Sequence, residues 1–341
     1  MQDFSKNFWA IGGGKGGVGK SITTVMLGSA LAKMGKKVII MDADLGGSNL
    51  HTLVGIRYPK YTLADFLKKA VSSLEDVVLE TPVPNMKMIC GADDILGIAN
   101  PKSAQKNKIF NHLQGLKADF ILIDLGAGSS FTTIDFFLYA PQKMVVLTPQ
   151  VTSIQNAYGF IKSSVYRKLS IEFKKEPEAV DLIDQATFPT SEKCIDSVAK
   201  LHEALSAIDR AYSDKLIDIL NSFNIHLLVN MVRDPKEKNV AAIIKSVSKN
   251  YLGLDLEIFG SIPFDGPLGT SINNMASFLT SEKEGFSRYS FYELALKVLK
   301  IHSIGEDTDS VGPVGSSEMK IGSDLPPTAG ADPSLYTAQS L

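Results

Sequence analysis

The chain has 341 residues, of which 44% are hydrophobic, so it is long enough to form one large α/β domain or two small ones around a substantial core. Its 35 basic and 37 acidic residues nearly cancel, which excludes an overall electrostatic attraction to nucleic acid or to anionic lipid. No secretory signal begins the chain and no apolar stretch approaches the roughly 20 residues of a spanning helix, so we expect a cytoplasmic protein.

Short apolar segments alternate along the chain with segments of helical spacing. The expected strands lie at 8–12, 37–41, 86–90, 120–123, 144–147, 226–229 and 257–262, and the expected helices at 22–34, 61–72, 105–116, 153–169 and 240–249. This alternation is typical of βαβ units, and it predicts an α/β fold with a doubly wound, mostly parallel sheet flanked by helices. Ligands of such sheets bind beyond the carboxyl ends of the strands.

Two segments fall outside this alternation. Between about 174 and 223, apolar residues recur every three or four positions, which predicts a helical insertion of one long amphipathic helix or two in succession. After Ile304 the chain is rich in Gly, Ser, Pro, Thr and Asp and has few large apolar residues, which predicts a disordered tail over 305–341. We expect residues 1–304 to form one domain that contains the insertion.

The segment GKGGVGKS at 14–21 lies between an expected strand and an expected helix, the context that a phosphate-binding loop requires. Its glycines let backbone N–H groups turn toward phosphate oxygens, and the helix adds a positive dipole end. Lys20 should reach the β- and γ-phosphates of a nucleotide, and Ser21 should ligate Mg²⁺. The residues assigned to phosphate binding are Gly14, Lys15, Gly16, Gly17, Val18, Gly19, Lys20, Ser21 and Ile22. A glycine-rich turn that binds nothing is the alternative.

Three carboxylates follow strands of the same expected sheet. Asp42 and Asp44 end the second strand, and Asp124 ends the strand at 120–123. Phosphoryl transfer requires charge neutralisation and a positioned water. Asp124 is placed to hold the Mg²⁺ hydration shell opposite Ser21; of Asp42 and Asp44, one would orient the water and the other support the metal, which gives Ser21, Asp42 and Asp124 as the metal set. Solvated turns rich in aspartate are the alternative.

Taken together, the motifs GKGGVGKS at 14–21, DADLGGSN at 42–49 and DLGAG at 124–128 resemble the MinD/ParA family of deviant Walker A ATPases, over roughly residues 7–300. The resemblance implies a P-loop NTPase fold of the SIMIBI class that uses ATP and Mg²⁺. It implies that Lys15 reaches across an ATP-sandwiched homodimer to the partner's phosphates. It also implies that Asp44 activates the water, so Lys15, Lys20 and Asp44 form the expected catalytic set.

The same resemblance implies further nucleotide contacts. Asn49 would belong to switch I, and residues 124–128 to switch II. Asn230 at the end of HLLVN, with Pro263 and Asp265 in the segment IPFD, would surround the adenine. Within the family, these motifs look most similar to the FlhG/FleN branch, which sets flagellar number and place.

The resemblance implies a slow, partner-stimulated ATP hydrolase that dimerises on ATP and regulates the place or number of a cellular structure, with flagellum-like polar machinery favoured. Three alternatives stay open: a chromosome or plasmid partitioning ATPase, a metal or iron–sulfur cluster carrier, and an ATP-binding adaptor that does not hydrolyse. The cysteines, Cys90 and Cys194, belong to no C-x-x-C or Cys/His cluster, which argues against the carrier. An unidentified protein activator is the expected partner, and the location could be peripheral to the membrane or polar.

Two surfaces suggest further partners, neither of them favoured. The segment 286–301 could dock on a membrane surface, but its apolar residues are not confined to one narrow face, which favours a helix packed on the sheet. A basic stretch could contact DNA phosphates, but interleaved glutamates favour an ordinary solvated helix face. The basic residues are Lys162, Arg167, Lys168, Lys174 and Lys175.

Overall fold

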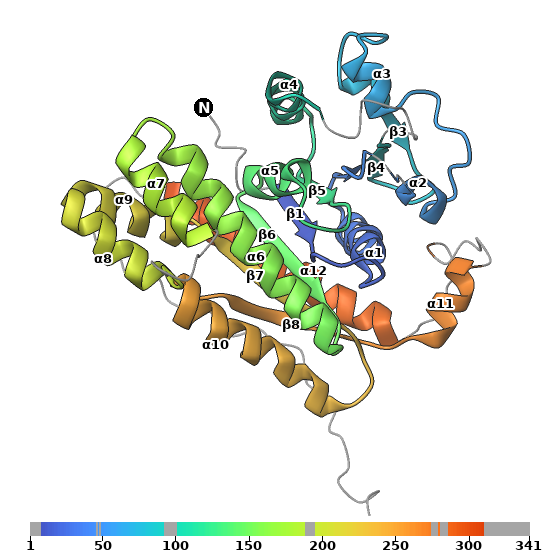
Figure 1. Ribbon diagram of the computed structural model, residues 1–341. Helices are drawn as coiled ribbons and strands as arrows, with labels where there is room; N and C mark the ends of the chain where they lie inside the picture. Colours follow the sequence, from blue (N-terminus) through green and yellow to red (C-terminus); the bar gives the residue numbers. More distant parts are fainter. Residues whose placement is uncertain are drawn as a thin grey trace, which may run out of the picture.

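The computed structural model describes residues 8–45, 47, 49–91, 101–187, 195–273, 279 and 286–309. Within them, one eight-stranded sheet has the order β3-β4-β2-β5-β1-β6-β7-β8 (Figure 1). The strands are β1 (Phe8–Gly12), β2 (Val38–Asp42), β3 (Val78–Glu80), β4 (Met86–Ile89), β5 (Phe120–Asp124), β6 (Gln142–Leu147), β7 (Asn224–Val232) and β8 (Glu257–Pro263). All neighbours pair in parallel except β3, which runs antiparallel to β4. The predicted doubly wound sheet is confirmed, with β3 as an addition.

Helices cover both faces of the sheet. They are α1 (Lys20–Lys33), α2 (Leu50–Leu53), α3 (Leu63–Leu67), α4 (Ser103–Gln114), α5 (Phe131–Tyr139), α6 (Val151–Glu172), α7 (Pro177–Thr187), α8 (Val198–Ile208), α9 (Arg210–Asn221), α10 (Val240–Leu252), α11 (Gly266–Asn273) and α12 (Phe286–Asp309). Two 3₁₀ turns, η2 (Glu75–Val77) and η3 (Pro235–Asn239), complete the described elements.

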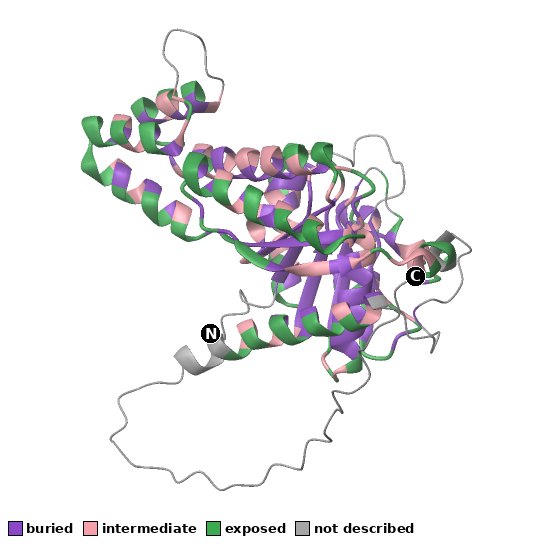
Figure 2. Ribbon diagram, turned by 90° about the horizontal axis from the view of Figure 1, so that it is seen from below, coloured by how far each residue is buried: buried purple, intermediate pink, exposed green. Residues whose placement is uncertain are grey.

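The sheet separates two hydrophobic cores. Successive side chains of a strand point to opposite faces, and along β1 Phe8 and Ala10 join the core under α3 to α10, while Trp9 and Ile11 join the core under α1 and α12. Figure 2 shows the central strands as buried and the outer faces of the helices as exposed. Burial on both faces explains why these strands appear in the sequence as continuous apolar runs.

The helical insertion packs against the end of α6 (Figure 1). Its apolar stripe is divided at Asp209 into α8 and α9, because the Asp209 carboxylate accepts the Ala211 N–H at 2.8 Å and caps α9. Leu201, Leu205 and Leu216 are buried in the core below α6. Of the two expectations for the insertion, two helices in succession are found in place of one long helix. Helix α7 precedes them as a third.

The last described helix, α12, packs on α1 and β8 through Phe291, Leu294 and Val298. It continues to Asp309, five residues past the expected domain end at 304, and the rest of the expected disordered tail lies outside the described residues. Among the described helices, none is long and apolar enough to cross a membrane.

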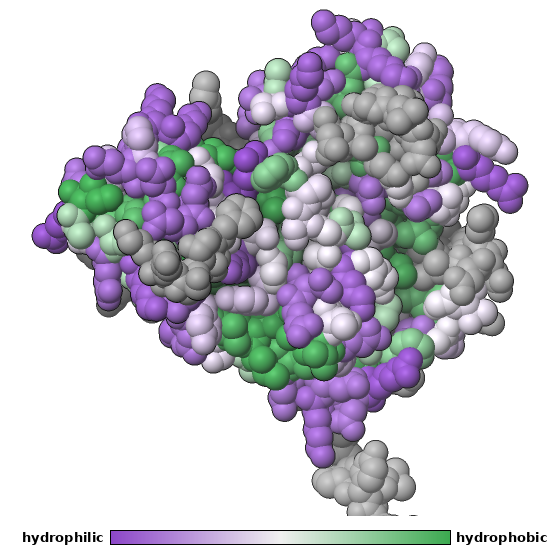
Figure 3. Space-filling model, in the orientation of Figure 1, coloured by the Kyte–Doolittle hydropathy of each residue, from purple (hydrophilic) through white to green (hydrophobic). Residues whose placement is uncertain are grey.

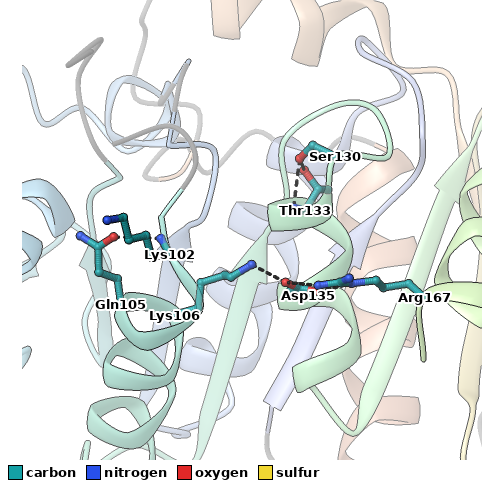
Figure 4. A network of polar contacts seen from close by, with 7 residues as sticks. All are labelled: Lys102, Gln105, Lys106, Ser130, Thr133, Asp135 and Arg167. Atoms are coloured by element: carbon teal, nitrogen blue, oxygen red, sulfur yellow. Dashed lines mark hydrogen bonds and ion pairs between the residues drawn. The ribbon is translucent and has the colours of Figure 1, made fainter. Parts of the chain in front are cut away.

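A buried ion network joins three helices on one face of the sheet (Figure 4). Asp135 of α5 pairs with Lys106 of α4, and it accepts hydrogen bonds from Arg167 of α6 at 2.9 and 3.2 Å. The Asp135 side chain is 12% exposed. Burial by itself would raise the pKa of Asp135, but hydrogen bonds and charge from Arg167 and Lys106 outweigh burial and lower that pKa. Because Arg167 is used here, it does not belong to a free DNA-binding surface.

We expect Asp135→Ala to lower the free energy of unfolding by about 3 kcal/mol, because it leaves the largely buried Lys106 without its anion. Since the folded-state pKa lies below the ordinary value of 3.8, the stabilisation is present above pH 3.8 and is lost as the pH falls through the lower value. Urea unfolding at pH 7 and below pH 3.8 measures both effects. Asp214→Ala is the matched control, because the Asp214 side chain is 66% exposed and lies 4.0 Å from Arg210, so it should change little.

Candidate functional site

The glycine-rich segment forms a tight loop between β1 and α1. Gly14, Gly17 and Gly19 have left-handed φ values of 67°, 78° and 93°. A Cβ atom at Gly19 would lie 2.2 Å from the Asn230 Nδ2 atom, so this position tolerates no side chain. Val18 is buried and Ile22 packs against the same core, which anchors the loop from below. The backbone turns of a phosphate-binding loop are therefore present.

Lys20 begins α1 and lies among carboxylates. Its side chain is buried, and its Nζ atom donates to the Lys15 carbonyl oxygen at 3.1 Å. Burial lowers the pKa of Lys20, whereas the charges of Asp124 and Asp44 act to raise it. The predicted lysine and two of the predicted carboxylates are thus within electrostatic reach of one another.

Asp124 ends β5 beside the start of α1. Its carboxylate accepts a hydrogen bond from the Thr24 hydroxyl at 3.3 Å and another from Ser21. Burial, followed by the charge of Asp42, raises the pKa of Asp124 to about 7, although Ser21, Lys20 and Thr24 act to lower it. Burial is thus the main reason for the raised pKa of Asp124, and the neighbouring donors and Lys20 offset it only in part.

Asp42 and Asp44 occupy different positions at the end of β2. Asp42 is paired in register with Asp124, and its two oxygens accept the N–H groups of Asp44 at 2.9 Å and Leu50 at 3.1 Å. The Asp44 carboxylate lies against Gly126: a Cβ atom there would be 2.9 Å from Asp44 Cγ. Asp42 thus shapes the loop that follows β2, while Asp44 faces the loop that follows β5.

The second lysine of the loop, Lys15, turns back onto its own chain. Its Nζ atom donates to the Thr152 hydroxyl at 2.8 Å and to Gln150 Oε1 at 3.4 Å, at the start of α6. The loop after β5 also contacts the glycine-rich loop, since the Gly128 N–H donates to the Gly14 carbonyl at 3.0 Å. Lys15 therefore lies at the rim of the site on a contact that must break before it can reach another molecule.

Asn230 ends the regular part of β7 and supports the loop directly. Its Nδ2 atom donates to the Val18 carbonyl at 2.9 Å, and its Oδ1 atom accepts the Met231 N–H at 2.9 Å. Met231 has a left-handed φ of 59°, at an irregularity in the pairing of β7 with β8. This local turn directs the Asn230 side chain toward the loop, next to the region expected to hold adenine.

The other residues expected near the nucleotide make local contacts. The Asn49 amide donates to the Gly47 carbonyl at 2.9 Å within its own loop. Pro263 ends β8, and Asp265 accepts the Leu268 N–H at 3.0 Å and the Ser287 hydroxyl at 2.5 Å, which ties α11 to α12. Gly16 and Gly17 are exposed at the loop tip.

Sequence reasoning missed several contributors. Thr24 lies one helical turn after Lys20, so it is on the same face of α1, and this spacing could have indicated its contact with Asp124. Thr152 follows the end of β6, so the sequence places it at the carboxyl edge of the sheet. Its contact with Lys15 could not be predicted from the sequence. The Arg233 guanidinium stacks 4.2 Å from the Phe264 ring centroid, which joins the segments after β7 and β8.

The donor set suits a magnesium nucleotide better than a protein-only metal cage. Among the described residues, no three His, Cys, Asp or Glu side chains gather in a metal-binding group. Mg²⁺ prefers oxygen ligands and commonly takes only one or two carboxylates plus waters and phosphates. The Ser21 hydroxyl hydrogen-bonded to Asp124 gives one alcohol and one carboxylate, which fits that pattern.

Comparison with curated proteins finds relatives over part of this chain. The antiactivator FleN of Pseudomonas aeruginosa is 34% identical over 155 residues, which are 45% of this chain and 54% of FleN. The flagellum site-determining protein YlxH of Helicobacter pylori is 33% identical over 46% of this chain and 52% of YlxH. The chain thus spans about half the length of these relatives.

Solved structures match the fold over most of the chain. The cell division ATPase MinD of Pyrococcus furiosus has a TM-score of 0.59 at 20% identity, covering 87% of this chain and 99% of that one. The septum site-determining protein MinD of Pyrococcus horikoshii, complexed with Mg-ADP, has a TM-score of 0.58 at 21% identity, covering 87% and 98%. These likenesses confirm the P-loop NTPase fold that the three motifs predicted.

The family match covers both the glycine-rich loop and the strand ends around it. Residues 9–278 match the family described as the CobQ/CobB/MinD/ParA nucleotide binding domain. With the loop, Lys20, Asp124 and Asp44 brought together at one edge of a sheet of this topology, the chain belongs to the CobQ/CobB/MinD/ParA nucleotide-binding family.

Proposed function

We propose that this protein is a MinD/ParA-type ATPase that dimerises on ATP, hydrolyses it slowly and regulates the place or number of a cellular structure. One observation carries the proposal: two lysines of one phosphate loop have different environments. Lys20 is buried among carboxylates, while Lys15 lies at the rim, where its ammonium group donates to Gln150 and Thr152 at the start of α6. A single-site nucleotide-binding protein needs the first lysine, whereas the second is suited to another subunit's phosphates.

In this proposal, ATP and Mg²⁺ are the cofactors, and a Mg-ADP complex of the Pyrococcus horikoshii MinD supports that choice. Residues 14–22 would bind the phosphates, and Ser21, Asp124 and Asp42 would hold the metal shell, directly or through water. Bound Mg²⁺ would neutralise phosphate charge. Asn49, Asn230, Pro263 and Asp265 remain the proposed surroundings of the rest of the nucleotide.

In this proposal, different residues of the chain have different roles in hydrolysis. Lys20 neutralises the phosphates and holds them in place, because its ammonium group already lies inside the loop, on the Lys15 carbonyl. Asp44, facing Gly126, orients the attacking water and accepts its hydrogen bond. The Gly128 to Gly14 hydrogen bond connects this segment to the phosphate loop, so the two can move together when the nucleotide changes.

An exposed apolar surface lies next to the rim. Figure 3 shows apolar side chains gathered over α10 and the adjoining end of α6. Val151, beside Thr152, is 69% exposed, and Ile243 of α10 is 53% exposed. Contiguous exposed apolar side chains are typical of interaction sites. This surface supports contact with a second copy or with a protein activator.

We favour flagellar machinery as the regulated structure because the relatives FleN and YlxH are described as an antiactivator and a flagellum site-determining protein. A cytoplasmic protein that becomes polar or peripheral to the membrane follows from this choice. Two experiments test the flagellar assignment. Flagella are counted in cells from which the gene is deleted, and a fluorescent fusion of the protein is imaged in otherwise normal cells. Normal flagella together with misplaced chromosomal loci would instead support partitioning, and bound iron in anaerobically purified protein would support the cluster carrier.

The contact of Asn230 with Val18 predicts a role in shaping the phosphate loop. Asn230→Ala should weaken ADP binding by about tenfold, because the Val18 carbonyl loses its donor and the loop is less well ordered before binding. Isothermal titration of ADP with Mg²⁺ measures the change. Asn221→Ala, on the exposed end of α9, is the control. Unchanged affinity in a folded Asn230→Ala protein would show that the loop does not need this support.

Lys15→Ala should leave ATP binding nearly unchanged and prevent the ATP-dependent dimer, since its ammonium group is proposed to serve the partner's phosphates. Light scattering with Mg²⁺ and a non-hydrolysable ATP analogue measures the mass. Lys20→Ala should instead lose nucleotide binding itself. A Lys15→Ala protein that still dimerises with the analogue would contradict the role given to Lys15.

Asp44→Ala should slow phosphate release by about 100-fold or more, because the water loses its orienting carboxylate. The ATP-bound dimer should then accumulate, since the dimer interface is unchanged. Phosphate release and mass are measured on the same sample. If the wild-type protein releases no phosphate with any stimulant, the non-hydrolysing adaptor is the correct function.

A further inference from the structure

A hollow of about 820 Å³ opens beside α3 and α4, away from the phosphate loop. Its lining includes Lys60, Tyr61, Lys69, Ser72, Asp76 and Lys108. None of its lining residues belongs to the segments 14–22, 42–49 or 124–128 that form the nucleotide site. Its volume is within the range of sites that take small molecules, about 300 to 1,000 Å³.

The lining carries an excess of positive charge. Lys60, Lys69 and Lys108 form no ion pair with any residue that the structure describes. The one acidic side chain, Asp76, already accepts the Ser73 N–H at 2.9 Å and the Ser72 hydroxyl at 3.3 Å. Like charges around a concave surface focus the electrostatic field and attract anions.

The scaffold under these lysines is rigid. Phe66 of α3 is buried, and its ring meets His112 of α4 edge to face, with centroids 4.8 Å apart. The Lys108 ammonium lies 3.9 Å from the Phe66 ring centroid and donates to the Phe66 carbonyl at 3.4 Å. The two sides of the hollow are therefore held together before any ligand binds.

Lys69 occupies a position that favours glycine. Its φ is 63°, and the hydrogen bonds from Lys69 N–H to Phe66 O and from Ala70 N–H to Asp65 O close the end of α3 around it. A lysine in the left-handed region costs stability relative to glycine. The backbone turn does not require a lysine here, and Lys69 is one of the residues that line the hollow.

We propose that this hollow is a second ligand site, which binds a small soluble molecule carrying two or more phosphate groups. Lysine ammonium groups bind phosphate as point charges, and three of them line this hollow. The half-buried Tyr61 ring gives the wall an apolar surface for the rest of the ligand. Because the three lysines line one hollow and do not form a stripe along a helix, a compact ligand fits better than a nucleic-acid backbone.

The test is calorimetric titration of inorganic tripolyphosphate into the full chain, with ADP and Mg²⁺ in excess so that the nucleotide site is filled. We expect one further site, weakened about tenfold by Lys69→Gly and by Lys108→Ala. Lys117→Ala removes an exposed charge outside the hollow and should have no effect. Lys69→Gly should also keep or raise the melting temperature, which separates loss of binding from loss of folding.

The second site should persist in Lys20→Ala, so its fate does not depend on the proposed ATPase activity. No binding of tripolyphosphate, or binding that is unchanged in both Lys69→Gly and Lys108→Ala, would overturn the proposal. Duplex DNA and vesicles containing anionic phospholipid are tested in parallel. If either binds through Lys69 more tightly than tripolyphosphate does, the ligand is a polymer or a membrane surface and the small-molecule assignment is wrong.

Discussion

The buried carboxylate of Asp124 is the constraint on which the site depends. It is 3% exposed at the end of a central strand, where an unpaired charge would be strongly unfavourable. Ser21, Thr24 and Lys20 offset that cost, but burial and the charge of Asp42 still raise the pKa of Asp124 to about 7. In the unliganded chain, the charged form of Asp124 is therefore disfavoured, mainly by burial. In the proposed function, the Mg²⁺ ion of the bound nucleotide would offset this cost, so the buried carboxylate that is unfavourable without ligand would favour binding.

The phosphate loop is shaped from both halves of the sheet before a ligand arrives. On one side the Gly128 N–H bonds to Gly14, and on the other the Asn230 amide bonds to Val18. Such preorganisation reduces the entropy lost on binding. In the proposed function, the Gly128 contact couples the phosphate loop to the segment 124–128, and the Lys15 contact with Thr152 couples it to α6.

The main strands could be predicted because their burial on both faces requires runs of apolar residues. The exceptions were short or locally ambiguous. The edge strand β3 has two half-buried residues and one exposed residue, so it lacks a buried apolar run. Helix α5 is rich in aromatic and β-branched residues that favour strands, so its helix depends on the Ser130 cap and on the burial of Phe136 and Phe137. The helix expected over 61–72 ends at Leu67, because Lys69 adopts a left-handed backbone conformation. Lysine rarely adopts that conformation, so the sequence does not predict this helix end.

The sequence by itself determined the phosphate loop and the carboxylates at the strand ends, since glycine spacing and strand termini are local properties of the backbone. The tertiary structure decided which side chains meet there: that Asn230 supports the loop, that Lys15 rests on Thr152, and that lysines from two separate segments surround one hollow. Those partners are distant along the chain, and their contacts form only after the strand order and the packing of helices on the sheet have brought them together.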